Sequence, residues 1–115
     1  MKKRVLVMNG SRIVQSDSGE GWISEKVENA GSLRAGIYNI YTASPADKSQ
    51  PNVGVVVHTD KDSIYQQCGK KFIMHPRKDF DIIPAIGSAK SIEYDAAGKA
   101  VVSASANKLS RSRSR

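Results

Sequence analysis

Three side chains in the middle of the sequence, His58, Cys68 and His75, are of the types that ligate transition metals. Two imidazoles and one thiolate could together hold a zinc ion. Their spacings of ten and seven residues include no close pair of the CxxC or HxxxH kind, from which most zinc sites are built. We therefore interpret both histidines as structural or surface groups, and we expect no metal and no cofactor.

Cys68 is also the only thiol available as a nucleophile. It would need a base and an electropositive setting, which His75 and Lys70 supply only if the fold brings them to it. A half-buried cysteine in a strand is the simpler interpretation. The chain has no G-x-S-x-G elbow and no glycine-rich phosphate loop. The sequence thus predicts a protein that is not an enzyme, and a lone cysteine favours the reducing cytoplasm.

Four aspartates form two D-x-D pairs, Asp60 with Asp62 and Asp79 with Asp81. Paired carboxylates can bind a divalent cation or do acid–base work. Both pairs are next to lysine in the sequence, which favours solvated turns over a metal site. A hydrolase or nuclease that uses Asp60, Asp62 and His58 remains the least favoured alternative.

One basic cluster lies in the body of the chain, with aromatic residues between its members. It comprises Lys70, Lys71, His75, Arg77 and Lys78, interleaved with Tyr65, Phe72 and Phe80. On a sheet face, such side chains can hold phosphates and stack bases. Strand alternation separates Lys71 from Lys70, so neither face is cleanly basic. The alternative is that the rings belong to the core and the lysines surround it.

The net charge of +7 lies at the two ends of the chain. The residues concerned are Lys2, Lys3 and Arg4 at the start and Lys108, Arg111, Arg113 and Arg115 at the end. The rest of the chain has as many basic as acidic residues, so the high pI does not establish a basic face on the folded body. The Arg-Ser repeat at the end is a polycation that can release counterions from phosphate. An acidic protein surface is the alternative partner for it.

Short β-strands would have to position these residues. Asn9-Gly10 between two β-rich runs predicts a hairpin of strands 4–8 and 11–15. Residues 24–30 are expected to make one or two helical turns, with Ser24 as N-cap and Gly31 as C-cap. Further strands are expected at 36–43, 53–58, 63–68 and 71–75, and a closing hairpin at 91–95 and 99–103.

The pattern predicts a mainly β fold, α+β at most. We expect a small, strongly bent antiparallel sheet or open barrel of about seven short strands with one short helix. Residues 1–104 would form a single domain, and residues 105–115 a disordered basic tail. No apolar run approaches the roughly 18 residues that a membrane span needs.

Several stretches, taken in order and spacing, resemble the KfrB domain of bacterial plasmids across roughly residues 30–103. They are residues 36–41, 54–60, 64–67, 75–80, 84–87 and 92–95. The opening Val5–Gly10 is similar to small plasmid proteins that consist of this domain alone. The resemblance implies a cytoplasmic protein of plasmid stability or conjugative transfer. It also implies a plasmid-encoded partner, either a coiled-coil DNA-binding protein or a relaxase complex.

Two hypotheses follow for the function. In the first, the chain is a non-enzymatic adaptor that docks a protein partner, and the basic tail adds non-specific attraction to DNA. In the second, the domain binds nucleic acid directly through Lys70, Lys71, Arg77 and Lys78. Loss of DNA affinity on removal of the tail would favour the first hypothesis, and loss on substitution of the body lysines would favour the second.

Overall fold

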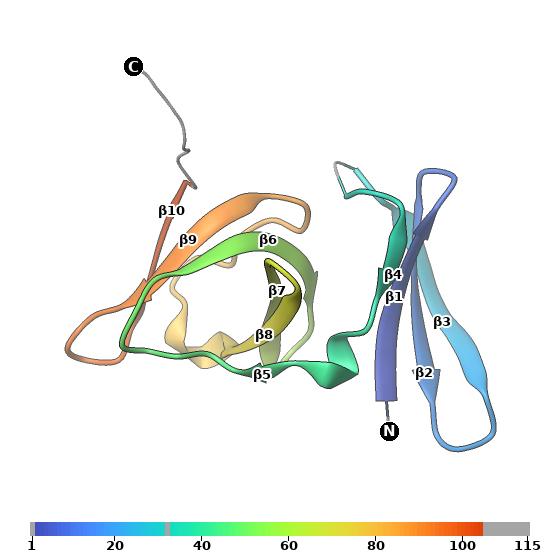
Figure 1. The fold of residues 1–115 in the computed structure, drawn as a ribbon, viewed down its shortest axis with the longest axis horizontal. Helices are drawn as coiled ribbons and strands as arrows, with labels where there is room; N and C mark the ends of the chain where they lie inside the picture. The colour runs from blue at the N-terminus through green and yellow to red at the C-terminus, as the bar shows by residue number, and fades with distance from the viewer. Residues whose placement is uncertain (1, 32, 105–115) are drawn as a thin grey trace.

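The fold consists of two β-sheets that lie side by side (Figure 1). The computed structural model describes residues 2–31 and 33–104. The elements of this part of the chain are β1 (Lys2–Met8), β2 (Ser11–Asp17), β3 (Trp22–Asn29), β4 (Gly36–Tyr38), a 3-10 turn η1 (Ile40–Thr42), β5 (Ser44–Pro45), β6 (Asn52–Thr59), β7 (Ser63–Cys68), β8 (Lys71–Pro76), a 3-10 turn η2 (Arg77–Asp79), β9 (Ala89–Tyr94) and β10 (Ala100–Ala104). The mainly β prediction is confirmed. No helix in this part is long and apolar enough to cross a membrane.

The first sheet has the strand order β3-β2-β1-β4 and is antiparallel throughout. The predicted hairpin is confirmed: β1 pairs with β2 over its full length, and the turn residues Asn9 and Gly10 have φ values of 51° and 76°. Positive φ at both positions is the requirement of a type I′ turn, which Asn-Gly meets at low cost.

The helix expected at residues 24–30 is wrong, because residues 24–29 belong to β3. This strand pairs with β2 along its length, with a register shift between Val14 and Gln15. Ser24 does not cap a helix, and its hydroxyl accepts a hydrogen bond from the Gln15 side chain. Weak local helix propensity is overridden here by a complete ladder of strand hydrogen bonds.

The second sheet has the order β10-β9-β6-β7-β8-β5, and Figure 1 shows it strongly curled. Three predicted strands, at 53–58, 63–68 and 71–75, and the closing hairpin are confirmed, with β6 in a central position between β9 and β7. The strand expected at 36–43 is only partly right. It ends at Tyr38, and after η1 the two-residue β5 pairs in parallel with β8. These short pieces raise the strand count of the described residues above the expected seven.

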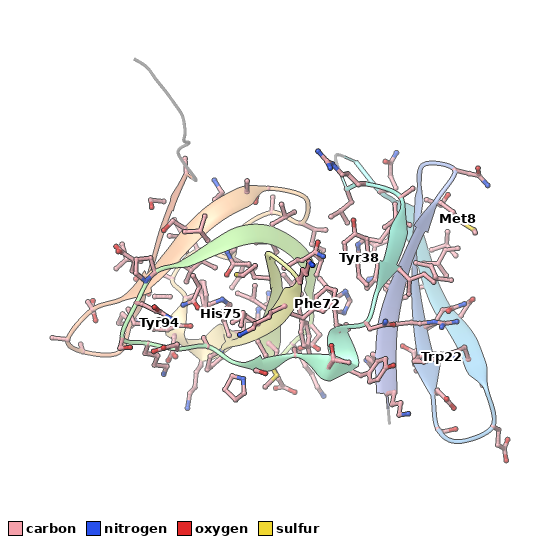
Figure 2. The ribbon with its side chains drawn as sticks, viewed as in Figure 1. Met8, Trp22, Tyr38, Phe72, His75 and Tyr94 are labelled. Atoms are coloured by element: carbon pink, nitrogen blue, oxygen red, sulfur yellow. The ribbon has the colours of Figure 1, made fainter. Side chains whose placement is uncertain are left out.

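Two apolar clusters hold the structure together. The first lies between the sheets and combines Val5 and Val7 of β1 with Val57 of β6. Figure 2 shows Tyr38 and Phe72 pointing into this space, and their rings meet edge to face at 6.3 Å. The second cluster is enclosed by the curled sheet and contains the side chain of Val56. Because neighbouring valines of β6 enter different clusters, this strand is buried on both faces, as its continuous apolar sequence predicts.

Candidate functional site

An apolar row crosses the outer face of the first sheet. Cross-strand pairing places Ile37 opposite Leu6, Leu6 opposite Ile13, and Ile13 opposite Val27. The alternate residues Val5 and Val14 point the other way, into the interior. Directly paired residues share one face of a sheet. The four side chains Ile37, Leu6, Ile13 and Val27, which we call the apolar row, therefore lie together on the side away from the second sheet.

The apolar row is open to solvent at its ends. Val27 is 63% exposed and Ile37 is 58% exposed, while Leu6 and Ile13 between them are half-buried. Met8, two residues after Leu6 in β1, is 50% exposed and projects from the same face (Figure 2). Contiguous exposed apolar groups of this kind mark surfaces that other proteins cover.

Polar groups border the apolar row. On one side the Arg4 Nε donates to Gln15 Oε1 at 2.8 Å, and the Gln15 amide donates to the Ser24 hydroxyl at 3.2 Å. On the other side Ser11 pairs with Asn29. An apolar centre with a polar border is the usual arrangement of a protein-binding patch.

Sequence reasoning missed the apolar row because it placed Val27 in a helix, whereas the row needs this residue in a strand paired with β2. One signal was present. The run Val5-Leu6-Val7-Met8 is apolar at every position, so in a strand it makes both faces of the sheet apolar. A sheet with only one buried face would alternate between polar and apolar residues.

The sequence-predicted basic residues divide into two pairs. Lys70 and Lys71 are exposed at the turn before β8, whereas Arg77 and Lys78 follow the end of that strand. Five residues of extended chain lie between the pairs, so Lys71 and Arg77 are roughly 20 Å apart at about 3.3 Å per residue. Arg77 is also engaged, because its Nη1 donates to the Asp60 carbonyl at 2.6 Å.

Lys70 and Lys71 border an open cleft of about 470 Å³, which Phe72 and the polar residues of the η1 segment also line. Neither lysine forms an ion pair with another described residue. This pair could therefore attract an anion. The predicted tail residues Lys108, Arg111, Arg113 and Arg115 lie outside the described residues.

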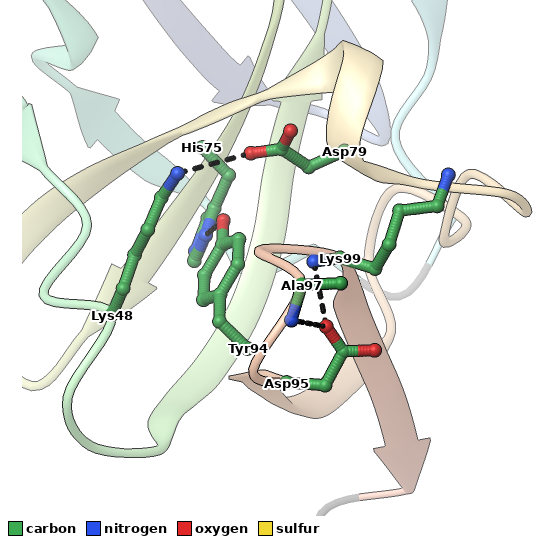
Figure 3. Close-up of polar contacts among 7 residues, drawn as sticks. All are labelled: Lys48, His75, Asp79, Tyr94, Asp95, Ala97 and Lys99. Atoms are coloured by element: carbon green, nitrogen blue, oxygen red, sulfur yellow. Dashed lines mark hydrogen bonds and ion pairs between the residues drawn. The ribbon is translucent and has the colours of Figure 1, made fainter.

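His75 belongs to a buried hydrogen-bond network. Its Nε2 lies 2.8 Å from Gln66 Oε1, and its Nδ1 lies 2.7 Å from the Tyr94 hydroxyl (Figure 3). The Gln66 amide nitrogen contacts three backbone carbonyls, so its side-chain oxygen must face the imidazole. His75 is then a neutral ring that donates from Nε2 and accepts from Tyr94. Burial lowers the pKa of His75 to about 4 and raises that of Tyr94 to about 12.

His58 lies where the two sheets meet. Its Nδ1 is 3.4 Å from Arg12 Nη2, and both side chains are buried. Burial first, and then the positive charge of Arg12, lower the pKa of His58 to about 4. Both histidines thus serve the structure as neutral rings, in agreement with the interpretation from sequence.

Neither Cys68 nor the aspartates form a reactive site in this geometry. Burial raises the pKa of the Cys68 thiol to about 11, which disfavours the nucleophilic thiolate. The Asp60 carboxylate accepts from the backbone amides of its own turn. Asp79 pairs with Lys48 and Asp81 with Lys99 (Figure 3 draws the first pair). Within residues 2–31 and 33–104, no three His, Cys, Asp or Glu side chains come together in a way that could hold a metal ion.

The curled second sheet coincides with a known domain. Residues 52–104, from the first residue of β6 to the last of β10, match the family model of the KfrB domain. This part of the chain is therefore similar to the KfrB domain. The resemblance noted from sequence is confirmed, although the match begins at Asn52 and leaves out the stretch at 36–41.

A second comparison extends beyond the KfrB domain. Protein TraB of Escherichia coli is 32% identical to this chain over 94 residues, which is 79% of the chain. The matched region is 64% of that relative, so the chain spans just under two thirds of its length. Neither KfrB nor TraB is the name of an enzyme family, and together the matches indicate a plasmid-related protein. The first sheet, which bears the apolar row, lies outside the KfrB match.

Proposed function

We propose that this chain is a non-enzymatic accessory protein of plasmid maintenance or conjugative transfer in the bacterial cytoplasm. It acts as an adaptor that binds a plasmid-encoded partner protein through the apolar row. Residues 1–104 act as one domain, and the basic tail adds non-specific attraction to DNA. The observation that carries the proposal is the exposure of Val27 and Ile37 at the two ends of a continuous apolar row.

The shape of the apolar row favours one kind of occupant. Four strands at a spacing of about 4.8 Å give a row roughly 15 Å long and one residue wide. Such a narrow row is too small for the roughly 800 Å² per partner that a stable dimer of two copies would bury. It suits the apolar stripe of a single amphipathic helix. A coiled-coil DNA-binding protein or a protein of the relaxase complex could supply that helix.

Photocrosslinking in a plasmid-bearing host tests this proposal. A photoreactive amino acid is placed at Val27 or Ile37 of the full chain, and in a separate variant at Ile82, which is 82% exposed and lies in the second half of the chain. We expect one plasmid-encoded protein to be crosslinked from positions 27 and 37 and not from position 82. Identical products from all three positions would contradict the proposal.

Charged substitutions at the same two kinds of position test whether the apolar row is needed for the crosslink. Val27→Glu puts a charge into the apolar row at an exposed position, so we expect the fold to persist and the crosslink from position 37 to disappear. Ile82→Glu adds the same charge elsewhere and should leave that crosslink intact. Retention of the crosslink in Val27→Glu would show that the row does not carry the interaction.

The second candidate function, direct nucleic-acid binding, is supported by the exposed Lys70 and Lys71 beside their cleft. Three full-length variants separate it from the adaptor function: alanine at Lys70 and Lys71, alanine at Arg77 and Lys78, and alanine at the four basic tail residues. Loss of most DNA affinity in the tail variant alone supports the adaptor with a DNA-attracting tail. Loss in the first variant instead supports direct binding.

A further inference from the structure

A second cluster of chemically distinctive residues lies at the N-terminal end of β1. Here the Arg4 guanidinium lies over the Trp22 ring at 4.1 Å, and the Lys2 ammonium lies 5.3 Å from the Tyr41 ring centroid. The rings of Trp22 and Tyr41 are themselves 5.9 Å apart. Two neighbouring aromatic rings thus each have a cation beside them. In the sequence, Lys2 and Arg4 are recognisable only as charge near the start of the chain.

An open cleft adjoins this pair of rings. It has a volume of about 560 Å³ and extends from the start of β1 to η1 and the edge of the second sheet. Lys2, Lys3, Tyr41 and Tyr65 are among its lining residues. Tyr41 is 44% exposed, so its ring belongs both to the cleft and to the contact with Trp22. The volume lies within the range of small-ligand sites.

We infer that this cleft, together with the Trp22 ring and Arg4 beside Tyr41, is a binding site for single-stranded nucleic acid, in which Tyr41 and Trp22 stack with bases and Lys2, Lys3 and Arg4 contact phosphates. This site adjoins the apolar row at Arg4 but includes none of its four residues, and it does not depend on the proposed adaptor function. Aromatic side chains that stack with successive bases, beside cations that follow the backbone, are the usual means of holding single strands. Duplex DNA keeps its bases stacked inside and cannot use the rings in this way.

The cation–π contacts suggest how binding proceeds. In the free protein, Lys2 and Arg4 occupy positions beside the rings. An incoming base replaces the cation beside a ring, and the displaced cation then contacts the adjoining phosphate. The exchange retains an attractive partner for each ring and each cation.

The balance of charge sets the expected strength of binding. Three carboxylates lie near the cluster: Asp17 accepts from backbone amides of its own loop, Glu25 lies 3.9 Å from Lys3, and Asp60 lines the cleft. They offset much of the basic charge, so electrostatic attraction alone does not make the site. Stacking must supply most of the affinity, and we expect a shallow dependence on salt.

The intrinsic fluorescence of Trp22, the only tryptophan, gives a direct measurement. The protein used is the full chain with alanine at Lys108, Arg111, Arg113 and Arg115, which removes the positive charge with which these residues would compete for nucleic acid. Oligothymidylate of about eight nucleotides is titrated at about 50 mM salt. We expect saturable quenching, with no comparable effect from duplex DNA or inorganic tripolyphosphate. Oligouridylate tests whether RNA offers the same chemistry.

Two variants of one residue provide the decisive comparison. Tyr41→Ala removes a ring and should weaken binding about tenfold, whereas Tyr41→Phe keeps the stacking surface and should bind like the parent. The urea midpoint of each variant checks that the fold is intact. Absence of saturable quenching, equal binding by Tyr41→Ala, or equal quenching by tripolyphosphate would each overturn the assignment.

Discussion

His58 and Arg12 face each other across the junction of the two sheets, with 3.4 Å between the imidazole Nδ1 and the guanidinium Nη2. Because the guanidinium stays protonated, it must donate, and the imidazole must accept as a neutral ring. The other terminal nitrogen of Arg12, Nη1, is buried without a hydrogen-bond partner among the described residues. The junction therefore contains one incompletely paired cation and cannot readily accept a second one at His58.

This relationship predicts that acid weakens the fold. The pKa of His58 is lowered from 6.5 to about 4, so between these values the unfolded chain binds more protons than the folded chain. The stability that depends on neutral His58 is fully present above pH 6.5 and is lost progressively as the pH falls toward 4. Urea unfolding monitored by Trp22 fluorescence across this window should show a falling midpoint.

The variant His58→Gln separates the acid sensitivity that arises from His58 from that of other titrating groups. Glutamine still offers an oxygen to Arg12 but does not titrate, so the decline of the urea midpoint with acid should become shallower. His75, whose pKa is also lowered to about 4, retains its own contribution in this variant. An unchanged pH profile in His58→Gln would show that the His58–Arg12 contact is not a source of acid sensitivity.

Because the Gln66 amide is buried, we expect Gln66→Glu to lower the free energy of unfolding much more than the same substitution at the neighbouring Gln67. Gln66 is fully buried, and its nitrogen donates to backbone carbonyls at 3.0 to 3.2 Å. Gln66→Glu replaces this donor with an oxygen that faces carbonyl oxygens, so we expect a loss of about 3 kcal/mol or more in the free energy of unfolding. Gln67→Glu, one residue along β7, is the control and should cost much less, as measured by urea denaturation. Similar losses in both variants would contradict the network.

Gly54 is predicted to tolerate no side chain. A Cβ atom built at this position of β6 would lie 1.9 Å from the carbonyl oxygen of Gln67, which is backbone of the paired strand. Gly54→Ala must therefore displace β7, at a cost of about 3 kcal/mol. Gly98→Ala meets no atom within 4 Å and suffers only from its φ of 84°, so it should cost about 1 kcal/mol. Thermal unfolding of the two variants checks the order, and a reversed order would be inconsistent with the packing of β6 on β7.

The sequence predicted those elements whose signals are local. Asn9-Gly10 specified the first hairpin, and the apolar run of β6 indicated a strand buried on both sides. The sequence did not predict β3, because the segment around Val27 becomes a strand only through its pairing with β2. The apolar row was missed for the same reason, since its four members come from four strands and share a face only in this register. The ring pair of Trp22 and Tyr41 likewise joins residues of distant segments.

Cys68 provides the last prediction, which concerns chemical reactivity. Burial raises the pKa of its thiol from 9.0 to about 11, so near pH 8 the thiolate fraction is lower by about a hundredfold than in an unperturbed thiol. The rate of thiol exchange with an aromatic disulfide reagent should therefore be far slower in the folded chain than in urea, where burial is lost. The denatured chain is the internal control, because it contains the same single thiol. A folded-state rate equal to that in urea would reveal an accessible, activated cysteine. Cys68 would then again be a candidate nucleophile.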